Sequence, residues 1–409
     1  MSNPKLALIP SGYQGGSTPK VYSVLPNDGS GDFTFARTGE ATRVRKDGLI
    51  ETVATTVPRL DWLNSDCPNL LLEPAATNSQ QYSELSTGKT VTGGTLTDNN
   101  SIAPTGEKKA MELKEDTNNS RHRFYVGGVL STTSGTQYTL SLFVKKQSDN
   151  RFIFINAGAF MGVSGSFDLD TQAVTGDVQL FETYSNGWYR IGITATANAT
   201  HTSGYFVQLQ QGTSDADYTG DGSSVLFWGL QFEESGLSSY IANLGSGSTT
   251  RNADVCTDAG DANTFNDNEG VLYAEIAALA DDETRRDIAI TDGSANNFVR
   301  FHYNSGASNT MRFQLKCAGT VRVNSTVVIS DITKFHKVAL SYKENDCKVY
   351  VDGVLVATDT NASPMPTGLN ELSFDDGGGA GLNDFYGKIK DLRYYDTAST
   401  DAELIELTR

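Results

Sequence analysis

Residues 347–359 are CKVYVDGVLVATD, two runs of alternating residues joined by Asp352-Gly353. Residues at every second position of a β-strand lie on the same face. Asp-Gly is a preferred two-residue hairpin turn, because both of its residues must take a positive φ. This stretch therefore predicts a β-hairpin whose first strand places Cys347, Val349 and Val351 on the core side.

Short strand-like runs surround this hairpin. GVLYAEIAAL, RDIAITDG, NNFVRFHY and TMRFQLKCAG precede it, and GKIKDLRYY follows. In the fourth run Met311, Phe313, Leu315 and Cys317 share one face. Thr400 and Glu403 form a capping-box pattern, which indicates a short C-terminal helix. We predict that residues 251–409 form an antiparallel β-sandwich.

Residues 76–250 show the same period of two. Two apolar sets each fall on one face: Tyr138, Leu140, Leu142 and Val144, and Tyr205, Val207 and Leu209. The run around Trp228, SSVLFWGLQFE, is apolar on both faces, as in a central strand. The strand count favours an eight- or nine-stranded antiparallel sandwich of jelly-roll type. The stretch GSGS at 245–248 indicates a boundary.

Residues 1–75 contain little core-forming sequence and many prolines and glycines. We expect an extended attachment arm whose apolar residues bury against a partner or the next domain. The alternative is that these residues supply the first strands of the following sandwich. The predicted class is all-β, with an arm and two sandwiches.

The chain has 409 residues, with 49 acidic and 32 basic side chains and a net charge of −17. This charge disfavours nucleic acid and anionic membranes as partners. We see neither a secretory signal nor a membrane-spanning run. The four cysteines are scattered, which favours reduced thiols over a zinc site or a disulfide scaffold. The charge grows from −1 in residues 1–75 to −6 in 76–250 and −10 in 251–409, so the arm is nearly neutral.

Motifs for catalysis are not evident. A glycoside hydrolase needs two carboxylates about 5–10 Å apart, and no Glu-x-Asp-x-Glu strand occurs. Neither a Gly-x-Ser-x-Gly elbow nor a phosphate-binding glycine loop is present. We therefore expect a protein without enzymatic activity and without an obligatory cofactor.

Three groups of residues are candidates for binding. Clustered oxygen ligands make calcium an alternative to simple solvated loops at Asp215, Asp217 and Asp221, and at Asp375, Asp376, Asn383 and Asp384. Aromatic rings beside polar residues are candidate glycan platforms at Tyr218 and at Tyr303 with Asn304. Capsid or subunit docking is the hypothesis for Arg37, Arg43, Arg45, Lys46 and Trp62.

Several motifs also resemble a known class of proteins. The run DGSGDFTFARTGEATRVRKDGLIETVATTVPRLDW, followed by CPNLLLEPAATN, resembles an N-terminal module of tailed-phage virion proteins. FWGLQFEESGLSSYIANLGSGSTTRNADV resembles the end of the sandwich that follows this module. FHKVALSYKENDCKVYVDGVLV and KIKDLRYYDTASTDAELIEL are similar to laminin-G or concanavalin A-like sandwiches.

The resemblance implies a structural virion protein, a head fibre or capsid decoration subunit made in the host cytoplasm. It implies a homo-oligomer, with a trimer favoured, that contacts other virion proteins through its N-terminal part. The alternative is a tail-associated, receptor-binding adhesin that recognises host glycans. Head or tail location and copy number stay open at this stage.

Overall fold

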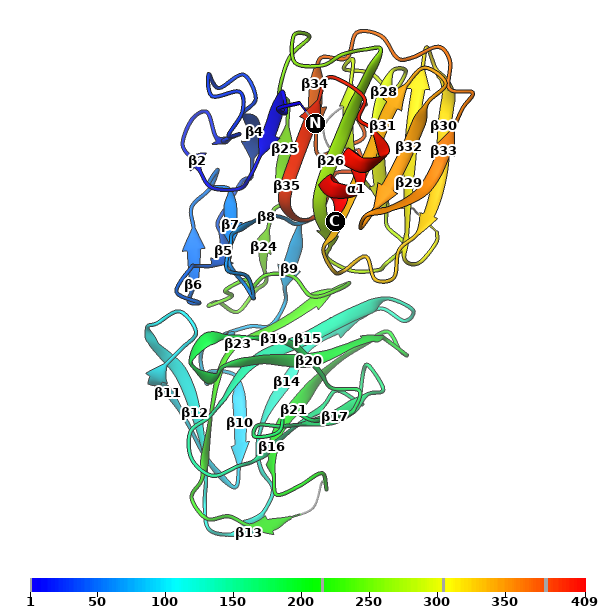
Figure 1. Cartoon of the computed structure of the whole chain (residues 1–409). Coiled ribbons are helices and arrows are strands. Elements are labelled where there is room, and N and C mark those ends of the chain that lie inside the picture. The colour runs from blue at the N-terminus through cyan, green and yellow to red at the C-terminus, as the bar shows by residue number, and fades with distance from the viewer. Residues whose placement is uncertain (1, 215–216, 304–305, 379–381) are drawn as a thin grey trace. The chain divides into compact units, whose positions relative to one another are not determined.

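The structure is a computed structural model that describes residues 2–214, 217–303, 306–378 and 382–409 (Figure 1). Strands form nearly all of its regular structure, which confirms the predicted all-β class. The chain forms two compact units. The first unit contains residues 1–39, 53–74 and 252–409, and the second contains 40–52 and 75–251. No helix among the described residues is long and apolar enough to cross a membrane.

The first unit is a sandwich of an eight-stranded and a five-stranded antiparallel sheet. The eight-stranded sheet has the order β33 (Val354–Asp359), β32 (Cys347–Val351), β31 (His336–Lys343), β26 (Glu269–Ala278), β35 (Gly387–Tyr395), β8 (Asn69–Leu72) and β7 (Arg59–Asp61), and β1 (Leu6–Leu8) also pairs with β35. The five-stranded sheet has the order β30 (Thr320–Val328), β29 (Thr310–Cys317), β28 (Phe298–Tyr303), β27 (Arg286–Thr291) and β34 (Glu371–Ser373). A small sheet adds β2 (Tyr13–Gln14), β3 (Lys20–Val21), β4 (Phe33–Ala36) and β25 (Val255–Thr257).

The hairpin that predicts this sandwich is confirmed. Asp352 and Gly353 have φ values of 48° and 79°, as the two-residue turn requires. Met311, Phe313 and Leu315 lie in the core between the two sheets, and Cys317 and Cys347 are buried. Helix α1 (Asp401–Thr408) starts with the predicted capping box of Thr400 and Glu403 and packs against the eight-stranded sheet.

The predicted attachment arm does not form a separate element. Leu6 pairs with Tyr394 and Leu70 pairs with Ile389, so β1 and β8 flank β35 within the last sandwich. Leu6, Leu8, Leu70 and Leu72 are at most 1% exposed in its core. Residues 40–52 instead belong to the second unit. The arm prediction fails because β1 and β8 pair with β35, which lies more than 300 residues later in the chain.

The second unit contains two six-stranded antiparallel sheets with one shared core, which is more than the eight or nine strands predicted. The first sheet has the order β10 (Lys89–Thr92), β14 (His122–Thr132), β21 (His201–Gln210), β16 (Phe152–Asn156), β17 (Ser164–Asp168) and β18 (Val174–Gly176). The second has the order β11 (Gly94–Ile102), β12 (Lys108–Glu115), β23 (Ser224–Glu234), β15 (Gln137–Lys146), β20 (Tyr189–Thr196) and β19 (Gln179–Thr183). Three short pairs complete it: β5 (Ala41–Val44) with β6 (Ile50–Val53), β9 (Ala76–Asn78) with β24 (Thr249–Arg251), and β13 (Asn119–Ser120) with β22 (Tyr218–Thr219).

The predicted inward residues of the second unit are in its core. Tyr138, Leu140, Leu142 and Val144 lie there together with Tyr205, Val207 and Leu209. Strand β23, which contains Trp228, lies between β12 and β15 and is buried along nearly its whole length. The predicted central strand is therefore confirmed.

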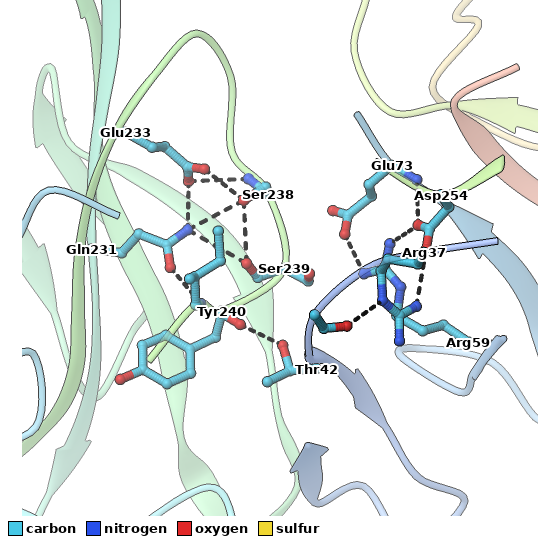
Figure 2. Close-up of polar contacts among 12 residues, drawn as sticks. Arg37, Thr42, Arg59, Glu73, Gln231, Glu233, Ser238, Ser239, Tyr240 and Asp254 are labelled. Carbon is cyan, nitrogen blue, oxygen red and sulfur yellow. Dashed lines mark hydrogen bonds and ion pairs between the residues drawn. The ribbon is translucent and has the colours of Figure 1, made fainter. Parts of the chain in front are cut away.

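Residues 236–243 pack on the outer face of the second sheet of this unit (Figure 2). Gln231 Oε1 accepts a 2.7 Å hydrogen bond from the backbone N–H of Ile241, and Glu233 Oε1 accepts one of 3.1 Å from that of Ser238. The Tyr240 ring lies 4.3 Å from the Trp228 ring. Gly229 has a φ of 60°, and a Cβ there would come within 3.0 Å of Tyr240. The aromatic-Gly-x-Gln-x-Glu motif therefore fixes a segment over the sheet.

A buried ion cluster ties together distant segments of the first unit (Figure 2). Asp254 pairs with Arg37 at 3.0 Å and also with Arg59, which pairs in turn with Glu73. The side chains of Arg37, Arg59 and Asp254 are fully buried. Arg37 also donates a 2.9 Å hydrogen bond to the carbonyl oxygen of Ala54. Four separate stretches of the chain therefore meet in one charged, buried contact.

Removal of the shared carboxylate is expected to destabilise the first unit strongly. Asp254→Ala leaves two buried guanidinium groups without their common partner, which costs about 3–5 kcal/mol. The exposed pair of Lys146 and Asp170 provides a control, because Asp170→Ala is expected to cost at most about 1 kcal/mol. Urea unfolding monitored by tryptophan fluorescence measures both values.

Asp254→Asn keeps the size of the side chain and tests the charge itself. It is expected to lie between the parent and Asp254→Ala in unfolding free energy. Equal stability of all three proteins would show that the cluster is not a structural constraint.

Candidate functional site

In the second unit, the outer face of the sheet that contains β14, β21 and β16 carries aromatic side chains. Residues of these strands alternate with the core residues Phe124, Val207 and Ile155 and therefore point to the other side. The strand register places six of these outward-pointing residues in two adjacent rows. One row contains Tyr125, Phe206 and Asn156, and the other contains Arg123, Gln208 and Phe154.

The rings of this aromatic face lie against one another and against a cation. The ring centroids of Phe154 and Phe206 are 5.9 Å apart, and the Arg123 guanidinium lies 4.7 Å from the centroid of Phe206. Tyr125 is 40% exposed. A Cβ on Gly204 would come within 2.7 Å of the Tyr125 hydroxyl oxygen, so the Tyr125 ring lies across the glycine. The sheet thus offers a partly exposed apolar platform.

The polar groups of the face complement the rings. Among the residues that the structure describes, Arg123 pairs with no carboxylate and lies over the Phe206 ring, although the chain has an excess of acids. Asn156 is half-buried beside Phe206, and Gln208 is fully buried between Arg123 and Phe154. Such a surface can pack ring faces against the C–H groups of a ligand while N–H donors bind its hydroxyl or carboxylate oxygens.

Sequence reasoning did not identify this face. The run GYFVQLQ correctly gives its core residues at alternate positions, but Phe206 and Gln208 occupy the positions between. In RFIFIN, Phe154 lies between the core residues Ile153 and Ile155 in the same way. The available signal was that the non-core positions of two strands also carry aromatic residues. Only the register shows that these strands are neighbours.

The outer face of the five-stranded sheet in the first unit differs, because its charged groups pair with one another. Asp287 is fully buried, binds Arg285 through two hydrogen bonds and lies 3.3 Å from Arg300. Arg300 also lies 3.9 Å above the Phe298 ring and donates to Gln314 Oε1. Burial, reinforced by the neighbouring Arg285, lowers the pKa of Arg300 to about 10, although Asp287 opposes this shift. These mutual contacts make this face a weaker candidate.

The residues predicted as glycan platforms do not lie on the aromatic face. Tyr303 is only 2% exposed and lies in the core of the first unit, so its prediction as a stacking surface is wrong. Asn304 lies outside the described residues. Tyr218 is half-buried, and its hydroxyl donates a 2.6 Å hydrogen bond to Glu115 Oε2 while its ring contacts His122.

The predicted docking residues do not form one surface. Arg37 is buried in the ion cluster, which rules out its predicted contact with a partner. Arg43 pairs with Glu51 at 2.7 Å, and Arg45 pairs with Asp47. Lys46 is exposed. Trp62 is half-buried and packs against the core of the first unit.

The first acidic loop uses its carboxylates in ion pairs. Asp217 lies 3.3 Å from Arg121, and Asp221 lies 2.7 Å from Arg151. Asp215 lies outside the described residues. Among those that are described, no group of three or more His, Cys, Asp or Glu side chains is arranged to hold a metal ion.

The second acidic loop brings carboxylates together in a buried setting. Asp375 is 3% exposed, and burial raises its pKa to about 6, with Asp384 and Asp376 adding to the shift. The backbone N–H of Gly377 donates a 2.8 Å hydrogen bond to Asp375 Oδ1 and partly offsets this effect. Asn383 Nδ2 donates to Asp376 Oδ2, and the Tyr386 hydroxyl donates to Asp384 Oδ2.

Comparison with known proteins identifies the domain at the C-terminus. Residues 249–405 match the model of the concanavalin A-like lectin/glucanase superfamily, so this part of the chain is a concanavalin A-like domain. A comparison with curated proteins gives no significant match.

Solved structures resemble parts of the chain at low identity. The Ruminococcus gnavus IT-sialidase CBM40 is 15% identical over 37% of this chain and 94% of its own, with a TM-score of 0.29. Domain 4 of AbnA, a GH43 arabinanase from Geobacillus stearothermophilus, is 16% identical over 43% and 83%, with a TM-score of 0.31. The mouse laminin alpha1 LG4-5 domains are 10% identical over 69% and 88%, with a TM-score of 0.24. At these values the likeness does not extend to function.

The buried carboxyl of Asp375 is expected to make stability depend on pH. A folded-state pKa of about 6, above the usual 3.8, lets the folded chain retain a proton that the unfolded chain releases. The unfolding free energy therefore falls as the pH rises between these two values. Asp375→Asn removes the effect and is expected to stabilise the protein by up to about 3 kcal/mol at pH 7.5, with no gain below about pH 4.

Urea unfolding at both pH values measures this difference. Asp331→Asn is the control, because hydrogen bonds from Thr333 lower the pKa of Asp331 and the substitution is not expected to stabilise the fold. Stabilisation of the parent by calcium that is lost in Asp375→Asn would contradict the prediction and favour the calcium alternative.

Proposed function

We propose that the chain is a non-enzymatic glycan-binding protein on the surface of a tailed-phage particle and that it binds through the aromatic face of the second unit. The partly exposed rings of Tyr125, Phe154 and Phe206 beside Arg123 carry this proposal. Exposed aromatic rings next to polar donors are typical of surfaces that recognise amphipathic ligands such as sugars. The presence of a domain from a superfamily that includes lectins is compatible with it.

Binding without cleavage is part of the proposal. Glycoside hydrolysis requires a pair of carboxylates across the scissile bond. The two rows of the aromatic face consist of aromatic, amide and arginine side chains and contain no carboxylate. We therefore expect bound oligosaccharides to be released intact, which mass spectrometry after prolonged incubation can test.

Loss of the rings is expected to abolish sugar binding. Bacterial surface polysaccharides on an array identify the ligand, and calorimetry measures its affinity. Phe206→Ala and Tyr125→Ala are each expected to weaken binding at least tenfold, since about 1.4 kcal/mol of lost contact suffices. Tyr22→Ala is the matched control, because Tyr22 is 39% exposed but lies in the first unit. Unchanged affinity of both face variants would exclude this face as the site.

Attachment to the particle is the second part of the proposal, and the N-terminal resemblance supports it. Residues 6–12 and 22–25 run antiparallel, with hydrogen bonds between Ala7 and Leu25 and between Gly12 and Tyr22. Four large apolar side chains on this pair of segments are 37–42% exposed: Ile9, Tyr22, Val24 and Leu25. A group of exposed apolar residues is typical of a protein contact.

A charge in this apolar pair is expected to prevent attachment. Particles that lack the protein are mixed with purified Val24→Asp, and bound protein is quantified after sedimentation. We expect an occupancy reduced at least fivefold, because a carboxylate would be buried at the contact. Val174→Asp is the control, since Val174 is 46% exposed in the second unit. Full occupancy of the Val24 variant would contradict attachment through these segments.

A further inference from the structure

One side of the first unit ends in two apolar edge strands. β33 is the terminal strand of the eight-stranded sheet and β30 that of the five-stranded sheet, and they lie next to each other (Figure 1). Among the described residues, β33 pairs only with β32, and β30 pairs only with β29. The outward backbone groups of both strands therefore lack sheet partners there.

The side chains of this edge are unusually apolar and exposed. Val321, Val328, Val354, Leu355 and Val356 are 45%, 80%, 60%, 45% and 37% exposed. These are five of the fourteen large hydrophobic side chains classed as exposed in the described part of the chain. Soluble proteins usually protect an edge with lysine, proline or a covering loop, so an exposed apolar edge indicates a contact.

The charge of the edge identifies the partner. The two strands contain one cation, Arg322, and one anion, Asp359, in a chain with a net charge of −17. Two copies of such an acidic chain repel each other, and this repulsion is smallest where the contacting surfaces are neutral. A basic partner would instead be expected to bind an acidic surface of the chain and not this neutral edge. A second copy of the same chain fits a neutral, apolar edge best.

We infer that two copies of this chain associate through the β30–β33 edge by a two-fold contact. The same edge on both copies is self-complementary when the strands run antiparallel, because each supplies the donors and acceptors that the other lacks. A register shift between Val349 and Tyr350 interrupts the regular pairing of β33. The exposed valine and leucine side chains therefore supply most of the contact, at about 25 cal/mol per Å² of buried apolar surface.

This contact differs from the three-fold assembly that the N-terminal resemblance implies, and it does not depend on glycan binding. If the aromatic face binds sugars weakly, pairing doubles the number of such faces and increases the avidity for a polyvalent surface. Pairing and sugar binding can be tested separately, because the two surfaces lie in different units.

Sedimentation equilibrium of the full chain between about 1 and 200 µM, a range that covers micromolar dissociation constants, tests the inference. We expect a reversible monomer–dimer equilibrium. The double variant L355K/V356K is expected to dissociate at least tenfold more readily, because a cation pair would face its symmetry mate. Val328→Lys on the neighbouring strand is expected to act in the same direction. Circular dichroism and thermal melting verify that both variants fold.

The matched control is I102K/L244K, two residues of the second unit that are 53% and 56% exposed. This variant is expected to dimerise like the parent. A parent that stays monomeric at every concentration overturns the inference, as does a dimer that persists in L355K/V356K. A trimer instead of a dimer excludes the two-fold contact. A monomeric parent whose particle attachment is lost in L355K/V356K assigns the edge to another virion protein.

Discussion

The buried contact of Arg37, Arg59, Glu73 and Asp254 constrains the path of the whole chain. The chain passes between its two units four times, after residues 39, 52, 74 and 251. Arg37, Glu73 and Asp254 each lie within three residues of one passage, and Arg37 binds the carbonyl of Ala54 beside the remaining one. The cluster thus holds the first-unit end of each of the four passages. Because buried ion pairs repay their desolvation only when every partner is present, the cluster favours this one path over alternatives.

The local fold could be predicted from sequence, but the long-range fold could not. Two predictions depend only on residues that are close in sequence, and both are confirmed: the Asp352-Gly353 turn and the alternation around Phe313. The position of β1 depends on its pairing with β35, in which Leu6 lies opposite Tyr394. Nothing in the sequence around Leu6 indicates this pairing. Arg37 illustrates the same limit for charge. An arginine among other cations is usually solvated, and its partner Asp254 is 217 residues away.

The candidate site shows why strand alternation alone is insufficient. Alternation predicts which residues of GYFVQLQ enter the core, and Tyr205 and Val207 do. It does not reveal that the remaining face of this strand adjoins another strand with aromatic residues at matching positions. The prediction of Tyr303 as an exposed glycan platform was wrong because it relied on a sequence neighbour and not on the strand register. Its polar neighbour Asn304 indicated exposure, yet the register with Met311 turns the Tyr303 ring into the core.

The residues that carry the phage-protein resemblance have an architectural role in this structure. Arg37, Arg59, Glu73 and Asp254 form the buried ion cluster, while Gln231 and Glu233 hold residues 236–243 over one sheet. That segment covers one outer face of the second unit, and the opposite sheet presents its partly exposed rings. Residues with such an architectural role indicate a chain path and do not identify a ligand. Recognition must therefore be sought on surfaces outside those motifs, which is where the aromatic face and the β30–β33 edge lie.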